Sequence, residues 1–160
     1  MLKQKRVYVE TTVVSYFAAR PSRDLLIAAH QEATREFWSR LAGRYEIYIS
    51  ALVYEEAGRG DPEQARVRLG VVKPLRMLDI DDAARKLAER MLTCGSVPKA
   101  NPEDALHLAI AAINGMDVFL TWNFAHLNNP FTREKVRRVV EDEGYRCPEI
   151  CSPDELLEVD

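Results

Sequence analysis

Residues 101–123, NPEDALHLAIAAINGMDVFLTWN, decide the fold because they join a helix directly to a buried strand. Asn101 is a favourable N-cap residue, and Pro102 is a favourable first residue of a helix. Apolar side chains then recur at helical spacing, at Leu106, Ala109, Ile110 and Ile113. The Asn-Gly pair at 114–115 is typical of a helix end. The stretch therefore predicts an amphipathic helix that ends just before this pair.

A short strand is predicted directly after this helix. Residues 117–121, DVFLT, form an apolar run with the composition of a buried strand, and the polar group 121–123, TWN, ends it. A helix that leads into a buried strand is half of a βαβ unit, and in open parallel sheets binding sites lie at the carboxyl ends of the strands. Asn123 lies at such an end. We therefore expect polar residues from other strands to meet it there.

The rest of the chain also alternates between short β-rich runs and helical patterns. Strands are predicted at 6–10, 45–50, 75–80, 117–121 and 149–151. Further helices are predicted from Thr11 or Thr12 and at 24–41, 51–57, 62–69, 82–93, 132–143 and 153–157. In the 24–41 helix the expected buried stripe is Leu25, Leu26, Ala29, Ala33, Phe37, Trp38 and Leu41. This alternation indicates an α/β fold, a mainly parallel central sheet flanked by helices on both faces, in one domain over residues 1–160.

The composition describes an ordinary folded protein without a strong overall charge. Apolar residues make up 47% of the 160 residues and charged residues 29%. Lys and Arg total 22 against 25 for Asp and Glu, so the net charge of −3 does not favour nonspecific nucleic-acid binding, although a local basic surface is compatible with it. The sequence shows no apolar run long enough for a bilayer and no signal peptide, and its three cysteines lack zinc-ligand spacing. We therefore expect a cytoplasmic protein that does not bind a membrane.

Four residues that the predicted sheet could bring into one crevice are candidates for a catalytic site. They are Glu10 at the end of the first strand, Glu56 on the helix after the second, Asp104 at the start of the central helix, and Asn123. Clustered carboxylates repel one another, and a divalent cation relieves that repulsion. Oxygen ligands select a hard cation such as Mg²⁺ or Mn²⁺. The chemistry that fits such a site is metal-assisted attack of water on a phosphodiester.

Each of these residues also has a purely structural explanation. Asp104 is favourable next to a helix N-terminus, Glu56 can be an exposed helix residue, and Asn123 is a common turn residue. Glu10 follows an apolar run and is expected to be partly buried, either at a catalytic site or in a salt bridge to Lys or Arg. The three histidines show no metal-ligand spacing, and His107 is interpreted as a packed or surface residue. Spacing along the chain does not decide between these explanations.

Four motifs in the sequence resemble those of PIN-domain ribonucleases. They are VYVETTVVSY at 7–16, ISALVYEEAGRG at 49–60, DALHLA at 104–109 and LTWNFAHL at 120–127. The motifs occur in the family order, and the resemblance extends over nearly the whole chain. The third and fourth motifs together are fairly specific. The branch that the chain resembles is the group of VapC-like toxins of bacteria and archaea.

The resemblance implies a PIN-like fold and an endoribonuclease that depends on Mg²⁺ or Mn²⁺. Carried over residue by residue, it assigns Glu10, Glu56 and Asp104 as metal ligands or as residues that position the metal-bound water. It assigns Asn123 as the fourth catalytic position, with Thr12 and Thr121 supporting the site by hydrogen bonds. In the toxin branch the protein is usually a homodimer whose groove is occupied by a small antitoxin. RNA and an antitoxin are therefore the partners implied for this chain.

A ribonuclease also needs a basic surface for its polyanionic substrate. The helix after the fourth motif carries a cluster of Arg133, Lys135, Arg137 and Arg138, and we expect this cluster to contact RNA. The same residues can instead keep an exposed helix face soluble. Trp122 is either a core residue or a platform for base stacking, and the core is the favoured interpretation.

Two positions bear on whether the site is active. The first acid of the family is usually Asp, whereas this chain has Glu10, whose extra methylene would move the carboxylate relative to a metal ion. Asn123 stands where the family has Asp or Asn, so the site has one formal charge fewer and is less suited to a second metal. The alternative is therefore a degraded PIN-like module that binds RNA or a protein without cutting it.

Two other kinds of α/β domain are disfavoured. A receiver-like domain needs a second acid next to the first-strand acid, and Thr11 and Thr12 occupy those positions. A dinucleotide-binding domain is disfavoured because no G-x-G-x-x-G follows the first strand.

Overall fold

The computed structural model describes residues 3–159, which form one sheet of five parallel strands in the order β3–β2–β1–β4–β5. The strands are β1 (Arg6–Val9), β2 (Glu46–Ser50), β3 (Arg76–Leu78), β4 (Val118–Leu120) and β5 (Glu149–Cys151). Each strand lies within one of the runs predicted from the sequence. The predicted α/β class with a parallel sheet is therefore confirmed.

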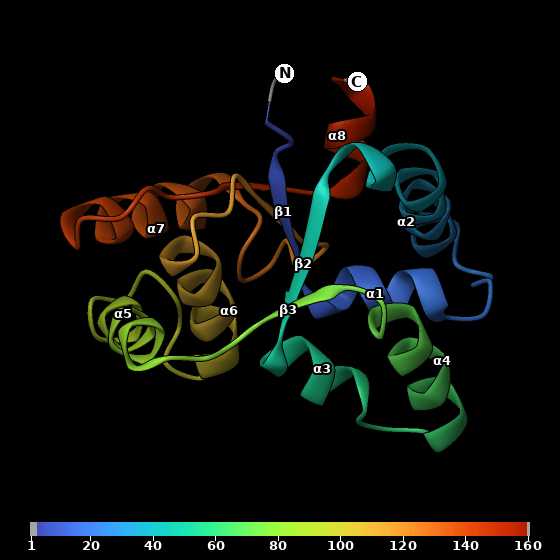
Figure 1. Ribbon diagram of the computed structural model, residues 1–160, viewed down its shortest axis with the longest axis horizontal. Helices are drawn as coiled ribbons and strands as arrows, with labels where there is room; N and C mark the ends of the chain where they lie inside the picture. Colours follow the sequence, from blue (N-terminus) through green and yellow to red (C-terminus); the bar gives the residue numbers. More distant parts are fainter. Residues whose placement is uncertain (1–2, 160) are drawn as a thin grey trace.

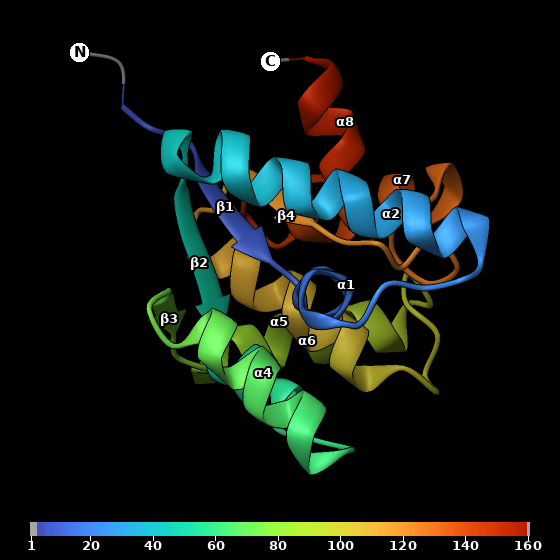
Figure 2. The same cartoon turned by 90° about the vertical axis from the view of Figure 1, so that its right-hand side faces the viewer.

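Helices cover both faces of the sheet (Figure 1). They are α1 (Thr11–Ala18), α2 (Leu25–Glu36), α3 (Ala51–Ala57), α4 (Pro62–Val72), α5 (Asp82–Thr93), α6 (Pro102–Ile113), α7 (Pro130–Asp142) and α8 (Pro153–Glu158), with a π-helical turn at Phe37–Leu41 and a 3₁₀ turn at Ala42–Arg44. Helices α5, α6 and α7 pack on one face and α1, α2 and α4 on the other, where α2 lies across the sheet (Figure 2). Within residues 3–159, no helix combines the length and the apolar composition that crossing a membrane requires.

The strand order explains this division of the helices. The chain adds β2 and β3 on one side of β1, and it then returns to add β4 and β5 on the other side. Crossovers between parallel strands are right-handed, so helices before and after this return cover opposite faces. The reversal lies between β1 and β4, and in open α/β sheets ligands bind outside the carboxyl ends of the strands at such a point.

The strand ends beside this reversal are aligned in register. Val9 of β1 pairs with Leu120 of β4, and the N–H of Glu10 donates to the Leu120 carbonyl at 3.0 Å. The N–H of Thr121 continues the ladder to the Cys151 carbonyl at 2.9 Å. The side chains that follow β1 and β4 therefore leave the sheet side by side at its carboxyl edge.

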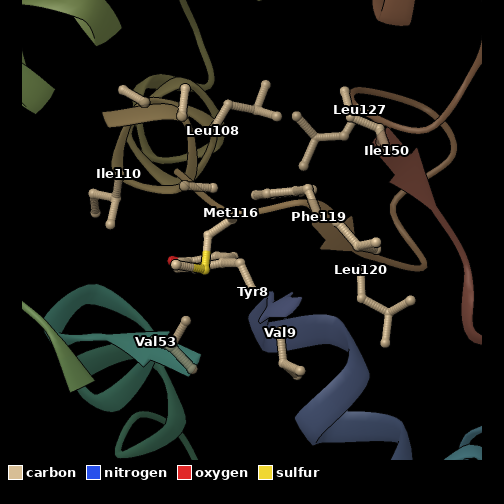
Figure 3. Close-up of a cluster of buried hydrophobic side chains, with 14 of the residues drawn as sticks. Tyr8, Val9, Val53, Leu108, Ile110, Met116, Phe119, Leu120, Leu127 and Ile150 are labelled. Carbon is tan, nitrogen blue, oxygen red and sulfur yellow. The ribbon is translucent and has the colours of Figure 1, made fainter. Parts of the chain in front are cut away.

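The core between the sheet and α6 is continuous and apolar (Figure 3). Side chains from β1, α6, β4 and β5 meet there, among them Tyr8, Leu108, Ile110, Phe119 and Ile150. The rings of Tyr8 and Phe119 stack with their centroids 5.3 Å apart. Helix α6 is buried over most of its length because the sheet covers one side and α5 covers another. This burial fixes the N-terminus of α6 at the carboxyl edge.

The N-terminal caps of two helices differ from the prediction. Helix α1 is capped by Glu10, whose carboxylate accepts from the N–H of Thr12, and not by Thr11 or Thr12. Asn101 precedes α6 as predicted, but its side chain makes no capping hydrogen bond, and its backbone lies at φ −123° and ψ 60° rather than in the extended region usual for a cap. Both starts lie at the edge described above, where tertiary contacts override the local helix signal.

The predicted apolar stripe is wrong for the first half of α2. The exposed residues there are Leu25, Leu26 and Ala29, whereas Gln31 and Thr34 are buried. Thr34 Oγ1 accepts from Trp122 Nε1 at 2.8 Å, and Trp122 is buried in the core, as favoured from the sequence. The inward face is polar because it must satisfy such groups. Phe37 is buried as predicted, and the side chain of Leu41 lies outside the described part of the chain.

We expect Phe119→Ala to destabilise the protein strongly. The side chain is fully buried and stacks on Tyr8, so its removal leaves a cavity between the sheet and α6. The free energy of unfolding should fall by about 3–5 kcal/mol, measured by urea unfolding with circular dichroism. Phe131→Ala, at a residue that is 77% exposed, is the matched control and should change it by less than about 0.5 kcal/mol. Similar losses in both variants would contradict the packing described.

Candidate active site at the carboxyl edge of the sheet

Glu10 is held at the end of β1 by hydroxyl and amide groups. Its side chain is 5% exposed. The carboxylate accepts hydrogen bonds from Thr12 N–H at 2.9 Å, from Thr12 Oγ1 at 2.5 Å and from Thr121 Oγ1 at 2.5 Å. Among residues 3–159, no Lys or Arg forms an ion pair with Glu10, so the salt bridge considered as an alternative is absent there. Hydroxyl and backbone N–H donors, together with the N-terminus of α1, thus hold this carboxylate.

Glu56 reaches the same edge from α3, the helix that follows β2. Its Oε1 accepts from Thr11 Oγ1 at 2.6 Å and lies 2.5 Å from His107 Nε2. Burial raises the pKa of Glu56, but its interactions with His107, of which the hydrogen bond is the larger, and its hydrogen bonds with Glu103 and Thr11 outweigh burial and lower the pKa to about 2. Glu56 is therefore ionised at neutral pH.

The pKa of the neighbouring acid Glu103 is raised, whereas that of Glu56 is lowered. Its hydrogen bond with Glu56 and its partial burial raise the pKa, although Arg59 acts to lower it. Arg59 pairs with Glu103 at 3.2 Å and with Glu55 at 3.0 Å. This arginine thus links the end of α3 to the start of α6 at the outer rim of the site, and it pairs with Glu55 rather than with Glu56.

Asp104 lies in the first turn of α6, opposite the residues that follow β4. Asn123 Nδ2 donates to Asp104 Oδ1 over a long 3.5 Å, and His126 Nδ1 lies 3.1 Å from Asp104 Oδ2. The oxygen of the Asn123 amide accepts from the N–H of His126 at 3.0 Å. Burial raises the pKa of Asp104 and the charge of Glu56 adds to the rise, whereas His126 and His107 lower it. Asp104 therefore has the weakest hydrogen bonds of the three acids.

Hydrogen bonds join five of these residues, and the Thr11–Thr12 peptide bond connects Glu56 to them. The N–H of Asn123 donates to Thr121 Oγ1 at 3.0 Å, and Thr121 Oγ1 donates to Glu10. Thr11, the neighbour of Thr12, donates to Glu56. The structure thus brings together at one edge all six residues singled out from the motifs, Glu10, Thr12, Glu56, Asp104, Thr121 and Asn123.

Within residues 3–159, the basic residues of α7 form no hydrogen bond with the six residues of this network. Arg133 Nη1 donates to Asn128 Oδ1 at 2.9 Å, which ties it to the loop that carries Asn123. Farther along the helix, Arg137 pairs with Glu149 at 3.5 Å and Arg138 with Glu134 at 2.7 Å, while Lys135 is exposed. Of the four, Arg133 has the most direct contact with the segment that follows β4.

Sequence reasoning missed the two histidines that contact the acids. His107 is 1% exposed, so its interpretation as a packed residue is correct, but its ring contacts Glu56 as well as the core. It follows Asp104 by three residues and therefore lies on the same face of α6. His126 follows Asn123 by three residues in the next loop. That spacing from a candidate residue is the signal that could have identified them.

The potential ligand atoms at this edge are oxygens, the type that a hard divalent cation prefers. Glu10, Glu56, Asp104 and Asn123 offer oxygen atoms, and within residues 3–159 the three carboxylates have no Lys or Arg partner, which favours a cation. In the described part of the chain, however, no group of three or more His, Cys, Asp or Glu side chains is arranged to hold a metal ion. A cation at this edge would accordingly have few protein ligands and several waters, which is common for Mg²⁺.

We expect part of the acid sensitivity of the fold to come from Glu56. Its folded-state pKa of about 2 lies below its ordinary value of 4.5, so its ionised form stabilises the fold above pH 4.5, and this contribution is lost as the pH falls from 4.5 to about 2. Glu56→Gln should flatten the loss of stability in that window, measured by urea unfolding in EDTA. Glu89→Gln, on the exposed side of α5, should keep the pH dependence of the parent. A Glu56→Gln protein with the slope of the parent would contradict the shift.

Comparisons with known proteins identify the fold. No family model and no curated protein matches this sequence. VapC20 from Mycobacterium tuberculosis, described as a toxin that cleaves the sarcin–ricin loop, aligns with a TM-score of 0.56 and 13% identity over 87% of this chain and 95% of VapC20. VapBC-1 from nontypeable Haemophilus influenzae aligns with a TM-score of 0.56 and 14% identity. The alignment covers 93% of this chain and 98% of the VapBC-1 chain.

A third structure agrees with these two. VapBC2 from Rickettsia felis, solved with a DNA fragment from its promoter, aligns with a TM-score of 0.55 and 17% identity. The alignment covers 74% of this chain and 88% of the VapBC2 chain. At these identities the likeness is one of fold. The chain therefore has the fold of the VapC toxins, which confirms the fold predicted from its resemblance to PIN-domain ribonucleases.

Proposed function

We propose that this protein is an endoribonuclease that depends on Mg²⁺ or Mn²⁺ and is the toxin of a toxin–antitoxin pair. The observation that supports this best is the set of three carboxylates, from Glu10, Glu56 and Asp104, at the edge where the sheet reverses. Their hydrogen-bond partners include Thr, Asn and His groups but, within the described residues, no Lys or Arg. An RNA phosphate is repelled by such a set until a cation neutralises it.

The residues at the carboxyl edge of the sheet would have different roles in phosphodiester hydrolysis. A divalent cation bound here would supply a Lewis acid for the phosphoryl oxygen and a readily ionised water. Glu56 and Asp104 would hold it together with Glu10, whose carboxylate is already fixed by Thr12 and Thr121 and needs no reorganisation. The neutral Asn123 orients Asp104 without adding charge, which suits one cation better than two.

The partners follow from the same proposal. Among proteins of similar fold, VapC20 is described as a toxin that cleaves the sarcin–ricin loop, which supports a structured RNA as substrate. The other two structures are VapBC structures, which supports a small antitoxin as a partner of this chain. We further propose a homodimer in the cytoplasm, where RNA is present.

A module that binds without cutting is the second candidate, and two observations favour it. The carboxylate of Glu10 is engaged as the N-cap of α1, and no ready-made group of three metal-binding side chains exists within residues 3–159. Calorimetric titration of the purified protein with Mn²⁺ separates the candidates. Saturable binding supports the nuclease, whereas RNA binding without any metal binding supports the module.

We expect Asp104→Asn to abolish RNA cleavage. The amide keeps the size of the side chain but removes a charge that faces Glu56 and the proposed cation. Cleavage of a structured RNA in Mg²⁺ should fall by at least about 100-fold. Cleavage by the parent should disappear in EDTA and return with Mn²⁺. Asp142→Asn, at an exposed residue of α7, is the matched control and should cut like the parent. Unchanged cleavage by Asp104→Asn would refute the proposal.

We expect the basic residues of α7 to bind RNA through their charge. In the Asp104→Asn background, which separates binding from cleavage, Lys135→Gln should weaken RNA affinity and lower the slope of log K against log salt by about 1. Lys73→Gln, at the end of α4 on the opposite face of the sheet, is the matched control and should leave the slope unchanged. Fluorescence anisotropy at a series of salt concentrations measures both. The same slope in Lys135→Gln and the parent would exclude Lys135 from the RNA surface.

A further inference from the structure

Glu56 lies at the outer end of a buried chain of hydrogen bonds. Ser50 Oγ and Tyr8 Oη lie 2.8 Å apart, Tyr8 Oη and His107 Nδ1 2.7 Å, and His107 Nε2 and Glu56 Oε1 2.5 Å. Ser50 and Tyr8 have no exposed surface, and His107 is 1% exposed. These three residues belong to β2, β1 and α6, so the chain joins three separate elements beneath the site.

The protons of this chain can be assigned because it ends in a carboxylate. Glu56 can only accept, so His107 Nε2 carries a proton and donates it. Nδ1 of the neutral ring then accepts from the hydroxyl of Tyr8, whose oxygen accepts from the hydroxyl of Ser50. Ser50 Oγ in turn accepts from the N–H of Val53 at 3.3 Å, which caps α3. Every buried hydroxyl proton has an acceptor in this arrangement.

Reversing the hydrogen bonds between His107, Tyr8 and Ser50 leaves a buried proton without an acceptor. If Nδ1 of His107 donated as well, Tyr8 would donate to Ser50, whose own proton would then find no acceptor among its described partners. Buried donors without a partner are unfavourable and rare. The first arrangement, in which each hydroxyl proton has an acceptor, is therefore the favoured one.

Packing alone does not require these polar groups. The ring of Tyr8 stacks on Phe119, and phenylalanine at position 8 would keep that contact. The neighbours of His107 on α6 are buried apolar residues, and leucine at this position would occupy the core without burying two ring nitrogens. What the hydroxyl and the imidazole add is a directed hydrogen bond to Glu56.

We propose that Tyr8 and His107 form a positioning pair that fixes the Glu56 carboxylate for the nuclease reaction. The inference rests on the proposed function. A glutamate side chain has several rotatable bonds and samples many rotamers when it is free. His107 from α6 and Thr11 from α1 both bond to Oε1, so they hold the carboxylate from two sides and leave Oε2 outside these bonds. His107 contacts Glu56 rather than the substrate and acts through it.

Three variants of the full chain test the pair, namely Tyr8→Phe, His107→Leu and His107→Gln. The first two should lower kcat for RNA cleavage by about 10- to 100-fold. Their KM should stay within about twofold, because neither residue contacts RNA. Glutamine at 107 retains a donor for Glu56 and should recover part of the loss. Tyr145→Phe, which removes a hydroxyl between α7 and β5, is the matched control and should keep the kcat of the parent.

Nuclear magnetic resonance gives a readout that does not depend on cleavage. Long-range ¹H–¹⁵N spectra should show His107 protonated at Nε2 and unprotonated at Nδ1. Side-chain couplings of Glu56 should indicate one rotamer in the parent and averaging in Tyr8→Phe and His107→Leu. If His107→Leu does not fold, Tyr8→Phe decides alone, since it removes a single oxygen.

The two readouts separate this inference from the proposed function. A parent that shows both spectral signatures but cuts no RNA would refute the nuclease and leave the hydrogen-bonded pair in place. Full kcat in Tyr8→Phe and His107→Leu would overturn the positioning role. So would a Glu56 rotamer that is unchanged in both variants.

Discussion

The hydrogen bond from the Thr121 hydroxyl to the Glu10 carboxylate is the contact on which the rest of the site depends. It joins the ends of β1 and β4, which are neighbours only because the chain reverses the direction of sheet growth between them. Other contacts build on it, since Thr12 Oγ1 also accepts from the N–H of Trp122 at 3.0 Å. A register shift of one residue would turn these side chains to the opposite face of the sheet.

The acids of the edge are stabilised differently from the acids of the surface. Exposed acids such as Glu63 and Glu134 pair with arginines one turn away on their own helices, at 2.6 Å and 2.7 Å. Such exposed pairs contribute little to stability. Glu10 and Asp104 instead meet hydroxyl, amide and imidazole groups. Hydroxyl and amide donors orient a carboxylate without cancelling its charge, so negative potential remains at the edge, and this is the physical basis of the proposed cation.

Glu10 has three structural roles. Its N–H bonds to Leu120 beyond the end of β1, its carboxylate caps α1 through the N–H of Thr12, and the same carboxylate joins the end of β4 through Thr121. A buried carboxylate with these partners is rigid, and rigidity lowers the cost of reorganisation in a reaction. The Tyr8–His107 pair has the same effect on Glu56 from beneath the sheet edge. The site is thus held by neutral donors that come from distant parts of the chain.

Apolar periodicity and turn residues act over a few neighbouring residues, so the strands and most of the helices could be predicted from the sequence. The exception among the helices is the predicted 24–41 segment, which the structure divides into α2 and a π-helical turn. The place of Glu10 after a strand could be predicted in the same way. The sequence did not predict which side of α2 faces inward, because Leu25 is exposed and Gln31 is buried. The partners of the buried polar groups needed the folded chain: Tyr8 and His107 are 99 residues apart in sequence, and Glu10 and Thr121 are 111 apart. A hydrogen bond depends on distance and direction in space, and local sequence patterns specify neither for segments so far apart.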